Sequence, residues 1–211
     1  MLNKIQLAFF DIDETLHQGE TIWEILHKKN HTWDSHGQKY WQMYLDKKID
    51  YEEFAKLDAA CWKGMPVEIL HEALNEVKLF EEVEQLFKKL LAKNIKIYLI
   101  SNSLSHMAQK IVQDFQLTGF HANDLIVIDG KLTGEIRLNV KYQDKGKIVR
   151  QILNQPENTG KKALAIGDSN NDLPMLEAVD FPVLYNPKNK NFKEYTGFTA
   201  RTWQEILDYI T

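Results

Sequence analysis

Four short apolar runs are the feature that most restricts what this 211-residue chain can fold into. They cover residues 7–10, 97–100, 163–166 and 183–185. Continuous apolar runs of this length are typical of strands that are buried on both faces. Helical stretches lie between the first three runs, and an alternation of strands and helices predicts a parallel sheet. We therefore expect an α/β fold with a Rossmann-like parallel sheet core.

The segments outside these runs carry further signals. Apolar residues recur at three- and four-residue steps over 76–93, which predicts a helix that packs on the sheet. Residues 125–138 contain two strand-like stretches separated by Asp129 and Gly130, which predicts a β-hairpin inserted in the core. The tail from residue 198 has the periodicity of a closing amphipathic helix.

Residues 16–75 differ from the rest of the chain, because they are helical, aromatic-rich and without a buried-strand run. We expect them to form a small helical cap inserted after the first strand, with 1–15 and 76–211 forming the core. The cap aromatics could line a ligand pocket, but aromatic residues at helical spacing more often form core, and we prefer that interpretation. They are Trp23, Trp33, Tyr40, Trp41, Tyr44, Phe54 and Trp62.

Composition limits the classes of partner. An apolar fraction of 44% and a charged fraction of 27% are ordinary for a folded protein. The net charge of −4 provides no basic field for nucleic acid or an anionic membrane. No signal peptide fits the N-terminus, and no apolar run approaches the roughly 20 residues that cross a bilayer. Cys61, the single cysteine, cannot form an internal disulfide. We expect a cytoplasmic protein with a small-molecule partner; its oligomeric state is left open.

Acidic and hydroxyl side chains follow the predicted strands. Asp11 and Asp13 come directly after the first run, and Ser101 follows the second. Ligands of α/β sheets bind beyond the carboxyl ends of the strands, so these side chains should face a crevice. Each has an ordinary alternative: a turn with a helix N-cap for the aspartates, and an N-cap for the serine.

Two further elements complete the set. Lys145 precedes Gly146 and could neutralise a bound phosphate, although lysines are usually solvated. Asp168 and Asp172 follow the third run and offer the hard oxygen ligands that Mg²⁺ prefers. Because three of the four elements lie at the ends of predicted buried strands, and all occur in order, a joint functional role is favoured over four separate structural ones.

This ordered set, DxDxT, a strand-end serine, lysine before glycine, and GDxxND, resembles the haloacid dehalogenase (HAD) superfamily. It is most similar to the phosphatase branch related to phosphoserine phosphatase. The resemblance extends to Gly19-Glu20-Thr21-Ile22 and to the 129–134 hairpin. It implies the HAD fold and a Mg²⁺-dependent phosphomonoester hydrolase that acts through an aspartyl-phosphate intermediate on a small phosphorylated metabolite.

The resemblance also implies roles for single residues. Asp11 would attack phosphorus, and Asp13 would be the general acid and then the base. Thr15 would support their loop. Mg²⁺ would lie between the Asp11 side chain, the Asp13 backbone carbonyl and Asp168, with Asp172 close behind. Asp13 favours phosphate chemistry, because dehalogenating members of the family lack an acid at this place.

The phosphoryl oxygens would be held by Ser101, the Asn102 backbone and Lys145. Lys147 competes with Lys145 for this role, and we prefer Lys145 because it directly precedes glycine, as in the family pattern. A phosphotransferase that passes the group to an alcohol stays open as an alternative. A non-catalytic binding module is disfavoured, because a binder would need neither nucleophile nor acid.

The cap departs from phosphoserine phosphatase where selectivity should lie. Asp58 stands where the family has an arginine that pairs with the substrate carboxylate, whereas Glu20 matches the residue that faces the amino group. We therefore expect a leaving group with an amine or quaternary ammonium, such as phosphoethanolamine or phosphocholine. The alternative for Glu20 and Asp58 is a solvated helix face. We expect His27, His31 and His36 to be surface residues rather than metal ligands, because their spacing is irregular.

Overall fold

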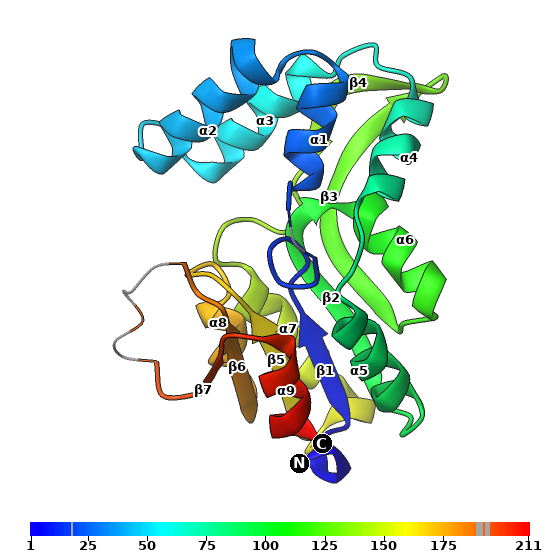
Figure 1. Cartoon of the computed structure of the whole chain (residues 1–211), viewed down its shortest axis with the longest axis vertical. Coiled ribbons are helices and arrows are strands. Elements are labelled where there is room, and N and C mark those ends of the chain that lie inside the picture. Colours follow the sequence, from blue (N-terminus) through cyan, green and yellow to red (C-terminus); the bar gives the residue numbers. More distant parts are fainter. Residues whose placement is uncertain (18, 189–191, 193–194) are drawn as a thin grey trace.

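The computed structural model describes residues 1–17, 19–188, 192 and 195–211. Its sheet has the strand order β4-β3-β2-β1-β5-β6-β7. Neighbouring strands are parallel except for the antiparallel pair β3 and β4, so the predicted α/β fold is confirmed (Figure 1). The strands are β1 Leu7–Phe10, β2 Lys96–Leu104, β3 Gly119–Ile128, β4 Lys131–Arg137, β5 Ala163–Gly167, β6 Phe181–Tyr185 and β7 Phe198–Ala200.

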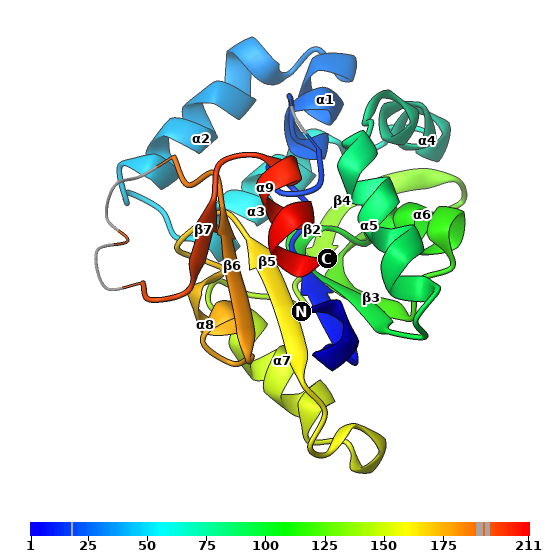
Figure 2. The same cartoon turned by 60° about the horizontal axis from the view of Figure 1, so that its bottom comes forward.

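Helices cover both faces of this sheet (Figure 2). In β1, Ala8 and Phe10 join one apolar cluster and Leu7 and Phe9 the other, because successive strand residues point to opposite faces. The first cluster includes α5, α6 and α9, and the second includes α7 and α8. The helices are α1 Ile22–Lys29, α2 Gln38–Leu45, α3 Tyr51–Cys61, α4 Val67–Glu76, α5 Glu81–Leu91, α6 Ser105–Phe115, α7 Lys145–Leu153, α8 Leu173–Leu176 and α9 Trp203–Ile210.

The single helix predicted for 76–93 is wrong at its start. Helix α4 ends at Glu76, and Val77 is extended, with φ −79° and ψ 121°. The chain then returns from the helical end of the molecule to the sheet, where the Phe80 N–H donates to the Leu16 carbonyl at 3.0 Å. Apolar periodicity continues across this crossing, because its side chains pack against the same core as the helix that follows. The period therefore does not reveal the break.

The predicted hairpin is confirmed at its turn, where Asp129 and Gly130 both have positive φ. Its first strand is longer than expected. Strand β3 begins at Gly119, pairs in parallel with β2 and only then pairs with β4, so the hairpin is an extension of the sheet rather than a separate insertion. Helix α3 packs against β4.

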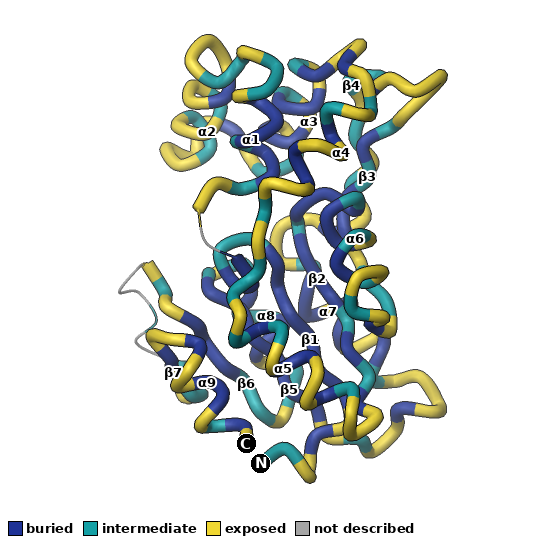
Figure 3. The backbone as a smooth tube through the Cα atoms, turned by 45° about the vertical axis from the view of Figure 1, so that its right-hand side comes forward, coloured by how far each residue is buried: buried dark blue, intermediate teal, exposed yellow. Residues whose placement is uncertain are grey.

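Helices α1 to α4 gather at one end of the molecule, above the carboxyl ends of β1 and β2 (Figure 1). Between residues 16 and 75 the described part of the chain is helical apart from loops and two isolated bridges. Figure 3 shows buried residues along the central strands β1, β2 and β5, and many exposed residues on the outer helices. Among the described helices, none is long and apolar enough to cross a membrane.

Candidate active site

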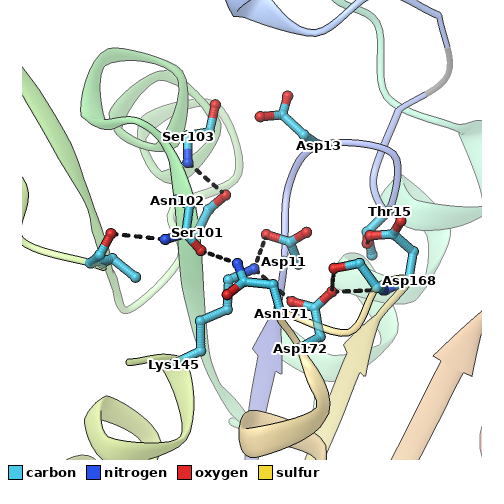
Figure 4. A network of polar contacts seen from close by, with 12 residues as sticks. Asp11, Asp13, Thr15, Ser101, Asn102, Ser103, Lys145, Asp168, Asn171 and Asp172 are labelled. Atoms are coloured by element: carbon cyan, nitrogen blue, oxygen red, sulfur yellow. Dashed lines mark hydrogen bonds and ion pairs between the residues drawn. The ribbon is translucent and has the colours of Figure 1, made fainter. Parts of the chain in front are cut away.

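Three buried carboxylates meet where the central strands end. Asp11 follows β1 and Asp168 follows β5, and these strands are parallel neighbours, so their ends reach the same edge of the sheet. The Asp11 N–H donates to the Ile166 carbonyl at 3.0 Å, which fixes the loop after β1 to β5. Carboxylate oxygens of Asp11, Asp168 and Asp172 lie within 4.8 Å of one another (Figure 4).

Lys145 is the cation of this cluster. It is the first residue of α7, its side chain is buried, and its Nζ lies 2.6 Å from Asp11 Oδ1 and 2.6 Å from Asp172 Oδ1. Lys147, the alternative lysine, is exposed. Gly146 allows this placement, because a Cβ at its position would lie 2.2 Å from the Pro174 carbonyl oxygen. The glycine after the lysine therefore lets α7 approach α8.

Asp172 organises the loop around Asp168. Its Oδ2 accepts hydrogen bonds from the Asp168 N–H at 3.1 Å, the Ser169 N–H at 2.9 Å and the Ser169 hydroxyl at 2.8 Å. Its Oδ1 faces Lys145. Both oxygens are thus already engaged by groups of the protein, so this carboxylate fixes the lysine and the loop between Gly167 and Asp172.

The cluster contains three acidic groups and one ammonium. Burial raises the pKa of Asp11 to about 7, against the opposing effect of Lys145. Burial and then the charge of Asp172 raise the pKa of Asp168 to about 9. Burial works to lower the pKa of Lys145, but Asp11 and Asp172 outweigh it and raise that pKa. Crowded hard oxygen donors with one ammonium among them fit a small divalent cation such as Mg²⁺.

Asp13 lies apart from the cluster, on the same loop as Asp11 (Figure 4). Its side chain is one-fifth exposed, and its Oδ1 lies 3.0 Å from Nε2 of the buried His17. Sequence reasoning missed His17; its place four residues after Asp13 is the one signal that could have found it. Thr15 donates from Oγ1 to Asp168 Oδ1 at 3.1 Å, so it ties the loop to the metal-ligand candidate.

Ser101, Asn102 and Ser103 continue β2 past its apolar stretch. The N-cap alternative for Ser101 is wrong, because α6 begins only at Ser105. Ser101 is buried, and its Oγ accepts from the Ser103 N–H at 3.1 Å. Asn102 donates from its side chain to the Val140 carbonyl at 2.8 Å and accepts from Asn171. The buried Ser103 hydroxyl has no hydrogen-bond partner among the described residues, and sequence reasoning had assigned it no role.

A cavity of about 540 Å³ joins this polar cluster to the helices above it. Asp11, Asp13, Ser101, Asn102, Lys145 and Asp168 line its lower part. Trp23, Trp33, Trp41, Tyr44 and Phe54 line its upper part, so these aromatics serve as pocket wall. Tyr40 and Trp62 are absent from the described lining. For most of the predicted set the pocket interpretation holds, while Trp23 and Phe54 are also buried core residues.

Glu20 and Asp58 have different surroundings. Glu20 is exposed, pairs with Lys28 and lies outside the described lining, as the solvated-face alternative predicts. That alternative is wrong for Asp58, which is 1% exposed and lines the cavity. Burial raises the pKa of Asp58, while His27 beside it lowers it. The surface prediction is also wrong for His27, which is buried with Nε2 3.1 Å from Asp58 Oδ1.

Tyr51 connects the upper and lower parts of the site. Its hydroxyl donates to the Asn102 carbonyl at 2.6 Å and accepts from Asn123 Nδ2 at 2.9 Å. The fully buried Asn123 also accepts from the Asn139 and Val140 N–H groups. Sequence reasoning missed both residues, because neither belongs to a motif and the contacts span 51 and 72 positions.

Comparison with known proteins places this geometry in a family. The haloacid dehalogenase-like hydrolase model matches residues 8–177. The chain is similar to the phosphoserine phosphatase of Methanocaldococcus jannaschii, 28% identical over all of both chains. It is also 28% identical to that of Lactococcus lactis, over 86% of this chain and 84% of the relative.

Solved structures agree with the sequence relatives. A phospho-aspartyl intermediate analogue of phosphoserine phosphatase superposes with a TM-score of 0.83 at 27% identity, over 99% of this chain and 100% of the other. A substrate-bound phosphoserine phosphatase complex superposes with a TM-score of 0.84 at 26% identity, over 99% of each chain. The chain belongs to the haloacid dehalogenase-like hydrolase family, in the branch that is similar to phosphoserine phosphatases.

Proposed function

We propose that the chain is a Mg²⁺-dependent phosphomonoester hydrolase that acts through an aspartyl phosphate on Asp11. The observation that carries the proposal is the position of Asp11, buried at the end of β1 with Lys145 at 2.6 Å and a second acid, Asp13, on the same loop. A buried carboxylate held by an ammonium suits a nucleophile, and a nearby partly exposed acid suits proton transfer. The substrate is a small phosphorylated metabolite.

Two displacements at phosphorus complete the reaction. An Asp11 oxygen forms a bond to phosphorus as the bond to the leaving oxygen breaks, and Asp13 gives that oxygen its proton. Asp13 then takes a proton from water, whose oxygen attacks the phosphoryl group and releases phosphate from Asp11. The hydrogen bond between His17 and Asp13 fixes one Asp13 oxygen and leaves the other for this transfer.

The surrounding side chains hold charge during these steps. Asp11, Asp168 and the Asp13 carbonyl would hold Mg²⁺, with Asp172 behind them, and the ion would offset the charge of the phosphoryl group. Ser101, the Asn102 N–H and Lys145 hold phosphoryl oxygens. We also propose that residues 16–75 act as a cap over a core of 1–15 and 76–211, because the cavity is lined from both sides.

Asp11→Asn tests the proposal, because the amide keeps the shape of the carboxylate but not its nucleophilicity. Turnover of phosphate monoesters with Mg²⁺ should fall to background, while circular dichroism and the urea midpoint show a folded chain. Chelation should abolish the activity of the unmodified chain, and added Mg²⁺ should restore it. Comparable turnover by a folded, uncontaminated Asp11→Asn preparation would refute the covalent mechanism, and full activity in EDTA would refute the metal requirement.

A further inference from the structure

The upper wall of the cavity is both aromatic and acidic. Helix α3 presents Tyr51, Phe54 and Asp58 to the cavity at steps of three and four residues, so the three lie on one helix face. Helix α1 adds Trp23 and Glu24. The aromatic rings form a continuous surface, with centroids 5.3 Å apart for Tyr44 and Phe54 and 5.7 Å apart for Trp41 and Phe54.

Cations are missing where a substrate carboxylate would need one. Among the described residues, the lining of the cavity contains Lys145 and Lys188 and no arginine. Lys145 is engaged by Asp11 and Asp172, and Lys188 by Glu14, all from the sheet side of the cavity. A carboxylate on the leaving group would therefore meet the acidic wall without a partner, which is unfavourable.

Asp58 is the strongest recognition group on this wall. It is buried, and although His27 Nε2 lies 3.1 Å from its Oδ1, the two atoms do not reach hydrogen-bond geometry. That oxygen is itself enclosed, so Asp58 would act on a ligand in the cavity through the charge of its carboxylate rather than through a hydrogen bond to Oδ1. Keeping a buried carboxylate charged is costly, so a cation in the cavity that Asp58 lines would stabilise it.

The wall keeps a negative balance when its neighbours are included. Glu20, Glu24 and Asp58 are three carboxylates, whereas the neighbouring cations are Lys28, paired with Glu20 and Glu24, and at most a protonated His27. The Lys28 ammonium also lies 5.8 Å from the centre of the Trp33 ring. One aromatic of this wall thus already contacts an alkylammonium group, which aromatic faces attract.

We propose that the cavity selects phosphate monoesters whose leaving alcohol carries a cationic nitrogen, of the ethanolamine or choline kind, with Asp58 as the main specificity residue. This inference rests on the proposed hydrolase function and names its substrate class. The phosphate occupies the Asp11 end of the cavity. The nitrogen lies against Asp58, Glu24 and the aromatic wall.

The first test compares substrates on the unmodified chain. Phosphocholine is compared with its carbon isostere, dimethylbutyl phosphate with a terminal tert-butyl group in place of the trimethylammonium group. The two compounds differ in charge but hardly in shape. Phosphoethanolamine and phosphoserine complete the panel. Of phosphocholine and phosphoethanolamine, the better substrate should have a kcat/KM about tenfold or more above those of dimethylbutyl phosphate and phosphoserine. Equal values for the charged and neutral compounds, or a preference for phosphoserine, would overturn the inference.

The second test removes the charge. Asp58→Asn should lower kcat/KM for the preferred cationic substrate by about tenfold and change that for dimethylbutyl phosphate by less than about twofold. Glu24→Gln, at a less buried position of the same wall, should act in the same direction and covers the case in which the Asp58 variant folds poorly. Glu53→Gln removes one charge from the exposed face of α3 and is the matched control. A uniform loss on all substrates would assign Asp58 a structural role and refute the inference.

A third test separates selectivity from catalysis. Calorimetric titration of the Asp11→Asn chain with Mg²⁺ measures binding of the intact monoesters without turnover. Tighter binding of phosphocholine or phosphoethanolamine than of dimethylbutyl phosphate, lost on adding Asp58→Asn, supports the inference even if no monoester is hydrolysed. Equal binding refutes it even if the chain proves to be an active phosphatase. The two proposals therefore fail by different results.

Discussion

At the scale of single residues, burial decides what the site carboxylates do. All three acids line the cavity, but Asp11 and Asp168 are buried, so their charged form is disfavoured, whereas the Asp13 side chain is one-fifth exposed. The same residue type is therefore a candidate nucleophile at one position and a candidate acid two residues later. The raised pKa values of Asp11 and Asp168 also make the stability of the metal-free chain depend on pH.

The pKa of Asp11 is raised to about 7 and that of Asp168 to about 9, both from an unfolded value of 3.8. The folded chain therefore binds more protons than the unfolded chain over this range, so its stability must fall as the pH rises. In EDTA we expect the free energy of unfolding to drop by about 5 kcal/mol between pH 6 and pH 9, as followed by urea titration. Saturating Mg²⁺ should abolish most of this drop, because the cation replaces the protons.

Asp168→Asn is the control for this prediction, since an amide does not titrate, and it should flatten the dependence in EDTA. A metal-free chain whose stability stays constant or rises over this range would contradict the assigned shifts.

At the scale of elements, the site depends on how closely α7 approaches α8. Lys145 begins α7, and Gly146 follows with no room for a Cβ against the Pro174 backbone. Gly146 thus has a packing role. It lets α7 lie close to α8, and this position of α7 allows the Lys145 side chain to reach Asp11.

Gly146→Ala should push α7 away from α8 and move the Lys145 ammonium from Asp11. We expect a loss of about 2 kcal/mol in stability by urea unfolding, together with a fall in kcat larger than the change in KM. Lys147→Ala, on the exposed side of the same turn, should change neither quantity appreciably. If the Gly146→Ala chain were as stable and as active as the unmodified chain, the close approach would have no role.

At the scale of the whole molecule, one partly buried polar network links the helical end to the sheet. Tyr51 from α3 and Asn123 from β3 meet the Asn102 carbonyl directly beside Ser101. Lys141 and Glu52 form an ion pair at 2.8 Å in the same region. The upper wall of the cavity is thus connected, through Tyr51, to strand β2, which would hold the phosphate.

Tyr51→Phe removes the hydroxyl and leaves the rest of the ring in place. We expect the free energy of unfolding to fall by about 1 kcal/mol, because one hydrogen-bonding group is lost. We expect kcat/KM for phosphate monoesters to fall severalfold, because helix α3 is held less firmly over the site. Tyr40→Phe removes a tyrosine hydroxyl outside the described lining and should leave both unchanged. Steady-state kinetics and thermal unfolding measure the effect. Equal changes of stability and kcat/KM in Tyr51→Phe and Tyr40→Phe would argue against a connection between α3 and β2 through Tyr51.

The sequence by itself determined the parallel sheet and the chemistry at its edge. Strands that are buried on both faces are built from apolar residues, and the apolar runs end at Phe10 and Ile166. The acids that follow, Asp11 and Asp168, were therefore expected at the strand ends. The order of the motifs then indicated the family. Local pattern was enough, because the information lies within a few residues of each strand end.

Only the tertiary structure decided the contacts between distant segments. Periodicity did not show the break between α4 and α5, since the crossing residues pack like helix residues. Asp58 resembled a solvated residue because the sequence does not show that His27, 31 positions earlier, lies beside it, on α1 facing α3. The link between Tyr51 and Asn123 likewise leaves no local signature. Burial and pairing of polar groups depend on which elements meet in space, and no short pattern encodes that.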